Sequence, residues 1–265
     1  MAEQNGLNWS QAKVDKLLEQ VLNGEIDEYN LPVELYYAIA QKLKDALYKG
    51  YGGTLSEFEG EPLELLQELR ENLYMFSAAK TYQQTRELTD LLVNEDGTIA
   101  TKKEFIDGAQ AIYDQYNKNW LSTEYETAIT SGQSAYAWKD IEETKDVFPY
   151  VIFSAVEDNN TTPECNEMDG KVFDVDDPIL DSCVPPLHFG CRSTLLKTDE
   201  DKGVLTRSES KELQGHVEEH MQDLFKNNPG KTGEVFNKDH DYFNVPRKDA
   251  KYAANNFDLP IPDED

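Results

Sequence analysis

Three cysteines and one histidine are the residues of this sequence best suited to chemistry. They are Cys165, Cys183, His188 and Cys191, in the pattern Cys-x17-Cys-x4-His-x2-Cys. Thiolate and imidazole groups are the ligands of closed structural zinc sites, which hold four of them. Pro185 and Pro186 stiffen the approach to His188. The set therefore predicts a structural zinc site, although Thr162 stands where the first cysteine of a standard C-x2-C pair would stand.

The residues alone leave three interpretations of this set open. It is a metal site, a group of buried free thiols beside a hydrogen-bonded histidine, or the source of one disulfide. An odd number of cysteines in a reducing compartment favours a metal or free thiols. Cys191 lies next to Arg192, which would lower the pKa of a nucleophilic thiol. However, the sequence marks neither an oxyanion site nor an orienting partner, so we assign no catalytic residue.

A second histidine pattern lies in residues 216–220, His-Val-Glu-Glu-His. It matches the H-x-x-E-H motif of one class of zinc peptidases. On a helix, His216 and His220 would lie one turn apart, with Glu219 beside them as a base. A third ligand would have to come from the short remainder of the chain, and acidic helices often match this pattern. We therefore expect a solvated helix face here.

Residues 1–146 are expected to form a largely α-helical region. Apolar residues recur at helical spacing in residues 10–24, residues 32–48 and residues 61–93. Two capping boxes, Thr101 with Glu104 and Thr123 with Glu126, predict the starts of two further helices.

Residues 147–265 are expected to form a small α+β module. Residues 148–158, 171–175 and 192–198 are rich in β-branched and aromatic residues and predict short strands. An amphipathic helix over about residues 208–226 and a loop-rich acidic tail follow them. The predicted fold class is therefore α+β, with the domain boundary between residues 146 and 147.

The composition limits the classes of partner. With 25 Lys and Arg against 52 Asp and Glu, the formal net charge is -27, spread along nearly every segment. Binding to duplex DNA requires clustered basic residues that neutralise phosphates, and the sequence has no such cluster. No window reaches the roughly 18 apolar residues of a membrane span. We therefore expect neither strong DNA binding nor membrane association.

Two motifs resemble those of a known family. The segment EDNNTTPECNEMDGKVFDVDDP, residues 157–178, followed by PPLHFGCRSTL, residues 185–195, resembles the phage Mu protein F-like family of minor head, or head morphogenesis, proteins. In that family an acidic-polar stretch, a His or Cys, a -DGKVF- strand, an acid-proline loop and a PPLHxxCR or related element follow in this order. The resemblance covers about residues 58–195.

The resemblance carries over to individual residues of this chain. Cys165 occupies the position where the family places a His or a Cys ahead of Asp169 and Gly170. His188, Cys191 and Arg192 occupy the PPLHxxCR element.

The chain also departs from the family pattern. Thr162 and Ser193 stand where some or many members have cysteines, so a site with four ligands depends on Cys183. We expect Asp169 and Gly170 to form a turn, and Arg192 to pair with an acid such as Asp169 or Asp176.

The resemblance implies a minor structural protein of a phage or prophage head. Such a protein acts with the portal in head morphogenesis and in genome packaging or ejection. The implied partners are the portal and major capsid proteins, on which residues 1–146 would dock. The protein would also come transiently close to the phage DNA. The implied location is the head interior or portal region of the virion, after assembly in the host cytoplasm. The implied cofactor is structural zinc. The alternative function is a metal-dependent hydrolase or a virion-packaged toxin-like effector.

Overall fold

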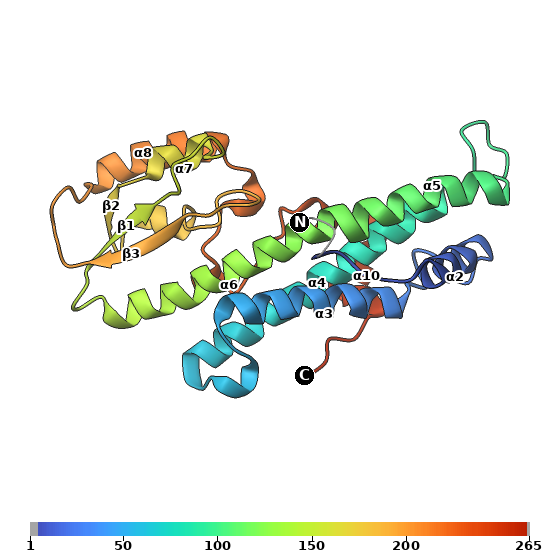
Figure 1. Cartoon of the computed structure of the whole chain (residues 1–265), viewed down its shortest axis with the longest axis horizontal. Coiled ribbons are helices and arrows are strands. Elements are labelled where there is room, and N and C mark those ends of the chain that lie inside the picture. The colour runs from blue at the N-terminus through green and yellow to red at the C-terminus, as the bar shows by residue number, and fades with distance from the viewer. Residues whose placement is uncertain (1–4, 264–265) are drawn as a thin grey trace. The chain divides into compact units, whose positions relative to one another are not determined.

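The computed structural model describes residues 5–263. Residues 1–4 of the predicted helical region and residues 264–265 of the predicted α+β module lie outside the described residues. The helices of at least 12 residues are α2 (Gln11–Leu22), α3 (Val33–Tyr51), α4 (Gly60–Asp90), α5 (Lys102–Asp114), α6 (Leu121–Thr144) and α8 (Arg207–His220). The shorter helices are α7 (Pro163–Met168), α9 (Pro229–Thr232) and α10 (Ala250–Ala254). The strands are β1 (Tyr150–Ser154), β2 (Val172–Asp174) and β3 (Thr194–Thr198) (Figure 1).

The predicted fold class is confirmed. The chain is largely helical as far as α6, and the strands that follow form one small antiparallel sheet in the order β2-β1-β3. Val151 of β1 pairs with Phe173 of β2, and Phe153 pairs with Leu195 of β3. Val151 and Phe153 are buried while their neighbours in β1 are only partly covered, as expected for alternating side chains of a strand. The three predicted strand segments are therefore confirmed.

Residues 102–144 form one continuous helical run. The π-helical segment Gln115–Trp120 joins α5 to α6 without a break. The capping box predicted for Thr101 and Glu104 is present, but the helix start predicted for Thr123 and Glu126 is wrong. The hydroxyl of Thr123 donates to the carbonyl oxygen of Asn119, 3.5 Å away and one turn back. A capping motif starts a helix only where the preceding backbone is not helical, and residues 115–122 contain no breaker.

The helix predicted over residues 208–226 is shorter than expected. It begins at Arg207, after a capping box formed by Thr206 and Glu209, and ends at His220. Met221 has extended backbone angles, and a 3-10 turn over Asp223–Phe225 follows. Among the residues described, no helix is both long and apolar enough to cross a bilayer.

The chain is divided into two compact units. One unit lies within Met1–Lys44, Leu73–Tyr125 and Asp241–Asp265, and the other comprises Asp45–Asn72 and Glu126–His240. The second unit contains the whole sheet. The division into domains at residues 146 and 147 stays a prediction.

The first of the two units, which we call the helical unit, buries an ion pair. The Nζ atom of Lys80 lies 2.8 Å from the Oε1 atom of Glu124, and both side chains are almost completely buried. The hydroxyl of Tyr242 donates to the same carboxylate oxygen at 3.1 Å. The Nζ atom of Lys80 also lies over the rings of Tyr116 and Tyr242, 5.4 and 5.0 Å from their centroids. The charge of Lys80 is thus compensated inside the core.

In the unit that contains the sheet, α3 and α6 pack with their backbones close together. A Cβ atom on Gly132 of α6 would lie 2.8 Å from the carbonyl oxygen of Leu47 in α3. A Cβ atom on Gly50 of α3 would meet the backbone of Ile129 in α6. Glycine is thus required at both positions by space, since neither has a positive φ.

Candidate metal-binding site

The first arm of the site is the short helix α7, which carries Cys165. Thr162 takes the N-cap position and Pro163 the first helical position, where its missing N–H removes no hydrogen bond. Asp169 and Gly170 form the turn after α7, and Gly170 has a φ of 68°. This turn is tied to β1, because the Gly170 amide donates to the carbonyl oxygen of Phe153 at 2.9 Å, and the Asp169 carboxylate accepts from the amide of Ala155, just after β1, at 2.7 Å. Cys165 is therefore held at a fixed place against the sheet.

The second arm is the segment that leads into β3. The peptide bond between Pro185 and Pro186 is cis, and both residues are buried. The amide of Cys191 donates to the carbonyl oxygen of His188 at 3.2 Å, which closes a turn with Gly190 at a φ of 76°. This turn brings the side chains of His188 and Cys191 to the same side.

The two arms bring three ligand atoms together. Cys165, His188 and Cys191 each offer one such atom, and these atoms lie within 4.8 Å of one another. The two sulfur atoms are 3.8 Å apart, and both cysteines are buried. Two sulfurs bound to one tetrahedral zinc at about 2.3 Å would be about 3.8 Å apart. The spacing and chemistry of these residues therefore fit a zinc ion.

The protonation of the cluster also fits a metal. Hydrogen bonds from Cys165 and His188 hold the pKa of Cys191 well below its usual range. The hydrogen bond with Cys191 raises the pKa of Cys165, and a second one raises that of His188. In the metal-free protein, the Cys191 thiolate is thus stabilised by two protons that a cation would replace.

The ring of His188 is oriented by the backbone. Its Nδ1 atom lies 2.8 Å from the carbonyl oxygen of Phe189. A carbonyl oxygen only accepts, so Nδ1 must carry the proton. The Nε2 atom is then the nitrogen that can bind a metal, an arrangement common in histidine ligands.

Cys183, the fourth predicted ligand, does not join this group. It is buried, and its sulfur lies 3.6 Å from the hydroxyl of Ser182. Burial raises the pKa of its thiol to about 11. The structure therefore brings together three of the four predicted ligands.

Ser193 lies at the cluster in place of Cys183. Its hydroxyl donates to the sulfur of Cys165 at 3.2 Å, and its side chain is buried. In the sequence, Ser193 is notable only because many family members have a cysteine at this position. The signal for a polar group at the site is its position two residues after Cys191.

Arg192 forms the predicted ion pair with an acid, but the two acids named as examples, Asp169 and Asp176, are wrong. Both terminal nitrogens of Arg192 donate to the carboxylate of Asp158, each at 2.7 Å. Asp169 instead accepts from the Ala155 amide, and Asp176 pairs with Lys145 at 2.9 Å. Asp169 and Asp176 are therefore each held by another partner, and Arg192 pairs with a third acid.

The H-x-x-E-H residues lie on the exposed face of α8. His216, Glu219 and His220 are all exposed, which confirms the predicted solvated face. The Nε2 atom of His220 is 3.9 Å from a carboxylate oxygen of Glu167. Within residues 5–263, Cys165, His188 and Cys191 form the one close group of three metal-ligating side chains, and α8 contributes none of them.

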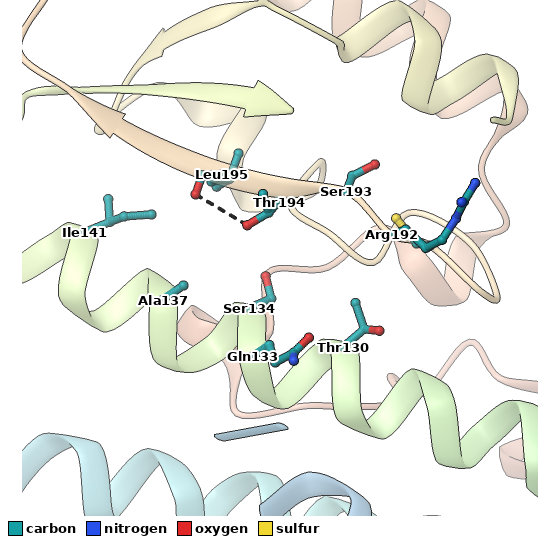
Figure 2. A pocket seen from close by; sticks show the side chains of 10 residues that line it. Thr130, Gln133, Ser134, Ala137, Ile141, Arg192, Ser193, Thr194 and Leu195 are labelled. Carbon is teal, nitrogen blue, oxygen red and sulfur yellow. Dashed lines mark hydrogen bonds between the residues drawn. The ribbon is translucent and has the colours of Figure 1, made fainter. Parts of the chain in front are cut away.

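Two hollows adjoin the cluster. The larger is a pocket of about 170 Å³ between one face of α6, from Thr130 to Ile141, and residues 191–195. Figure 2 shows the side chains of Thr130, Gln133 and Ser134 on α6, across from Ser193 and Thr194. The smaller hollow, of about 10 Å³, is lined by Val156, Asn160, Thr161, Cys165, His188, Arg192 and Ser193.

Comparison with known proteins identifies one segment of the chain. Residues 67–196 match the family model described as Phage Mu protein F like protein. The matched segment includes β1, β2 and the three clustered ligands, and it ends inside β3, at residue 196. No curated protein and no solved structure matches the chain.

Proposed function

Residues 67–196 belong to the phage Mu protein F like family of phage head morphogenesis proteins, and we propose that the chain is a minor structural protein of a phage or prophage head. It acts with the portal in head assembly and in genome packaging or ejection. Its place is the head interior or portal region of the virion, after assembly in the host cytoplasm. The family match is the observation that carries this proposal.

The charge of the chain supports a position near the genome. A protein with a net charge of -27 repels DNA, so it can border a DNA passage without retaining the genome.

Zinc has a structural role in this proposal. Cys165 from α7, with His188 and Cys191 from the segment before β3, would hold the ion and join the two arms. Structural zinc sites contribute about 10 to 16 kcal/mol of apparent binding free energy at neutral pH. The ion would therefore fix a region in which turns and short strands predominate.

We assign docking on the portal or capsid to the helical region. The turn between α4 and α5 carries two exposed apolar side chains, Val93 and Ile99, which are 56% and 83% exposed. They lie opposite each other in an isolated antiparallel bridge. Adjacent exposed apolar side chains are typical of contact sites between proteins.

Co-purification tests the proposal. The tagged chain is co-expressed with the portal and major capsid proteins encoded beside it, then isolated and examined by native mass spectrometry. We expect a complex with the portal or capsid protein. The double substitution Val93→Asp and Ile99→Asp should reduce the recovered partner at least tenfold.

A matched control is available in the other unit. Val147 is 65% exposed, so Val147→Asp adds the same charge without touching the turn between α4 and α5. It should leave the complex unchanged. Failure of the wild-type chain to bind either partner would contradict the proposed function, whereas equal effects of both variants would contradict only the assigned docking surface.

A further inference from the structure

We infer that the metal site is an open one, in which three protein ligands leave a fourth position for one water molecule or one small donor ligand held by Ser193. This inference rests on the zinc proposed above and deepens it. Closed structural sites have four protein ligands, whereas sites that exchange ligands have three. The difference decides whether the ion only joins the two arms or also binds a further group.

The first observation is the number of ligands. Among the described residues, only Cys165, His188 and Cys191 offer ligand atoms within 4.8 Å of one another. Cys183 faces Ser182 instead. A tetrahedral ion in this cluster would therefore have one position that no cysteine or histidine fills.

The second observation is the size of the smaller hollow. Its volume is about 10 Å³, roughly the space of one water molecule, and it opens to solvent because Val156, Asn160 and Arg192 in its lining are exposed. Two of the three ligands, Cys165 and His188, line it. The hollow is thus next to the ion position and has the size of a single water.

The third observation is the chemistry of the lining. A bound water needs polar partners, and the side chains of Ser193, Asn160 and Thr161 are polar and line this hollow. The hydroxyl of Ser193 already lies 3.2 Å from the sulfur of Cys165. Ser193 therefore holds the fourth ligand, and its hydroxyl is a hydrogen-bonding group that both donates and accepts.

The fourth position is also open to ligands larger than water. Arg192 and Ser193 line both the small hollow and the 170 Å³ pocket beside α6. The class of ligand is a small monodentate donor such as azide, a thiolate or an imidazole, free or carried on a side chain.

X-ray absorption spectroscopy of the zinc-loaded full chain counts the sulfur ligands. We expect two sulfurs and two lighter ligands in the wild type, and three sulfurs in Ser193→Cys. Cys183→Ala is the control and should keep two sulfurs. Cobalt replacement then tests exchange, because azide should shift the visible absorption bands of the wild type but not those of Ser193→Cys.

The outcomes separate this inference from the zinc proposal. Three sulfurs in the wild type, falling to two in Cys183→Ala, would overturn the open site and leave zinc in place. Two sulfurs with cobalt bands insensitive to azide would also overturn it, because another protein group would then close the site. A wild-type chain that binds no zinc would overturn both the open site and the proposed zinc. The role in the phage head would then still be tested by binding to the portal, which is a separate measurement.

Discussion

Arg192 and Asp158 form a bidentate ion pair at the rim of the metal-binding site. Each of the two hydrogen bonds is 2.7 Å long, and the planar guanidinium matches the carboxylate. Asp158 lies in the loop between β1 and α7, and Arg192 directly follows Cys191. The pair therefore connects the two arms that carry the ligands.

This pair predicts a pH dependence. Arg192 lowers the pKa of Asp158 to about 2, against about 3.9 for an unfolded aspartate. Because the folded pKa is the lower one, the stabilisation is complete above pH 4 and is lost as the pH falls through 2. Urea unfolding should show a steeper fall in stability between pH 4 and 2 for the wild type than for Asp158→Asn. Parallel curves would refute this role of Asp158.

Each of the three clustered ligands should be required for zinc binding. Cys165→Ala, His188→Ala and Cys191→Ala should each lower the zinc content from about one ion per chain to near zero, because two remaining ligands bind zinc weakly. Elemental analysis after dialysis measures this. His216→Ala is the control and should keep its zinc, since His216 is exposed on α8. Loss of zinc from this control alone would move the site to α8.

The contact between α3 and α6 depends on glycine. Gly132→Ala should destabilise the protein by about 1 to 3 kcal/mol, because the new Cβ would lie 2.8 Å from the Leu47 carbonyl oxygen. Gly215 in α8 has no atom within 4 Å of such a Cβ. Gly215→Ala should therefore stabilise the protein by up to about 1 kcal/mol. Thermal unfolding of both variants checks this, and the same sign for both would contradict it.

We expect the effects of substituting Lys80 and Glu124, the buried ion pair of the helical unit, on stability to be strongly coupled. Removing one partner, as in Lys80→Met or Glu124→Leu, should cost about 3 to 5 kcal/mol, because an unpaired charge stays buried. Desolvation lowers the pKa of Lys80 and raises that of Glu124, which shows that burial opposes both charges. The double variant should therefore be more stable than either single one. Additive losses in urea unfolding would exclude this coupling.

An exposed pair in the same unit is the control. Lys102 and Glu19 lie 2.8 Å apart, but both side chains are more than half exposed. Lys102→Ala should cost no more than about 1 kcal/mol.

Most elements could be predicted from the sequence, because their signals are local. The capping box at Thr101 specifies its own backbone, and the apolar strand segments require burial. The Thr123 motif has the same letters but follows helical residues, so local pattern alone could not reveal its context. The partner of Arg192 and the isolation of Cys183 depend on how distant loops fold together. For the same reason, the sequence predicted the four ligand candidates but not which three meet.

The net charge of -27 should keep the chain from binding duplex DNA. A chain with 52 acidic and 25 basic residues should not retard duplex DNA on gels at physiological salt. A shift of the DNA band under these conditions would contradict the proposed position beside a DNA passage.

Quantitative mass spectrometry of purified heads tests whether the chain is a component of the phage head. The heads are purified from the phage or induced prophage that encodes the chain. We expect the chain to be present in the heads at a constant ratio to the portal protein. Heads that lack the chain, while the lysate contains it in abundance, would show that it is not a head protein.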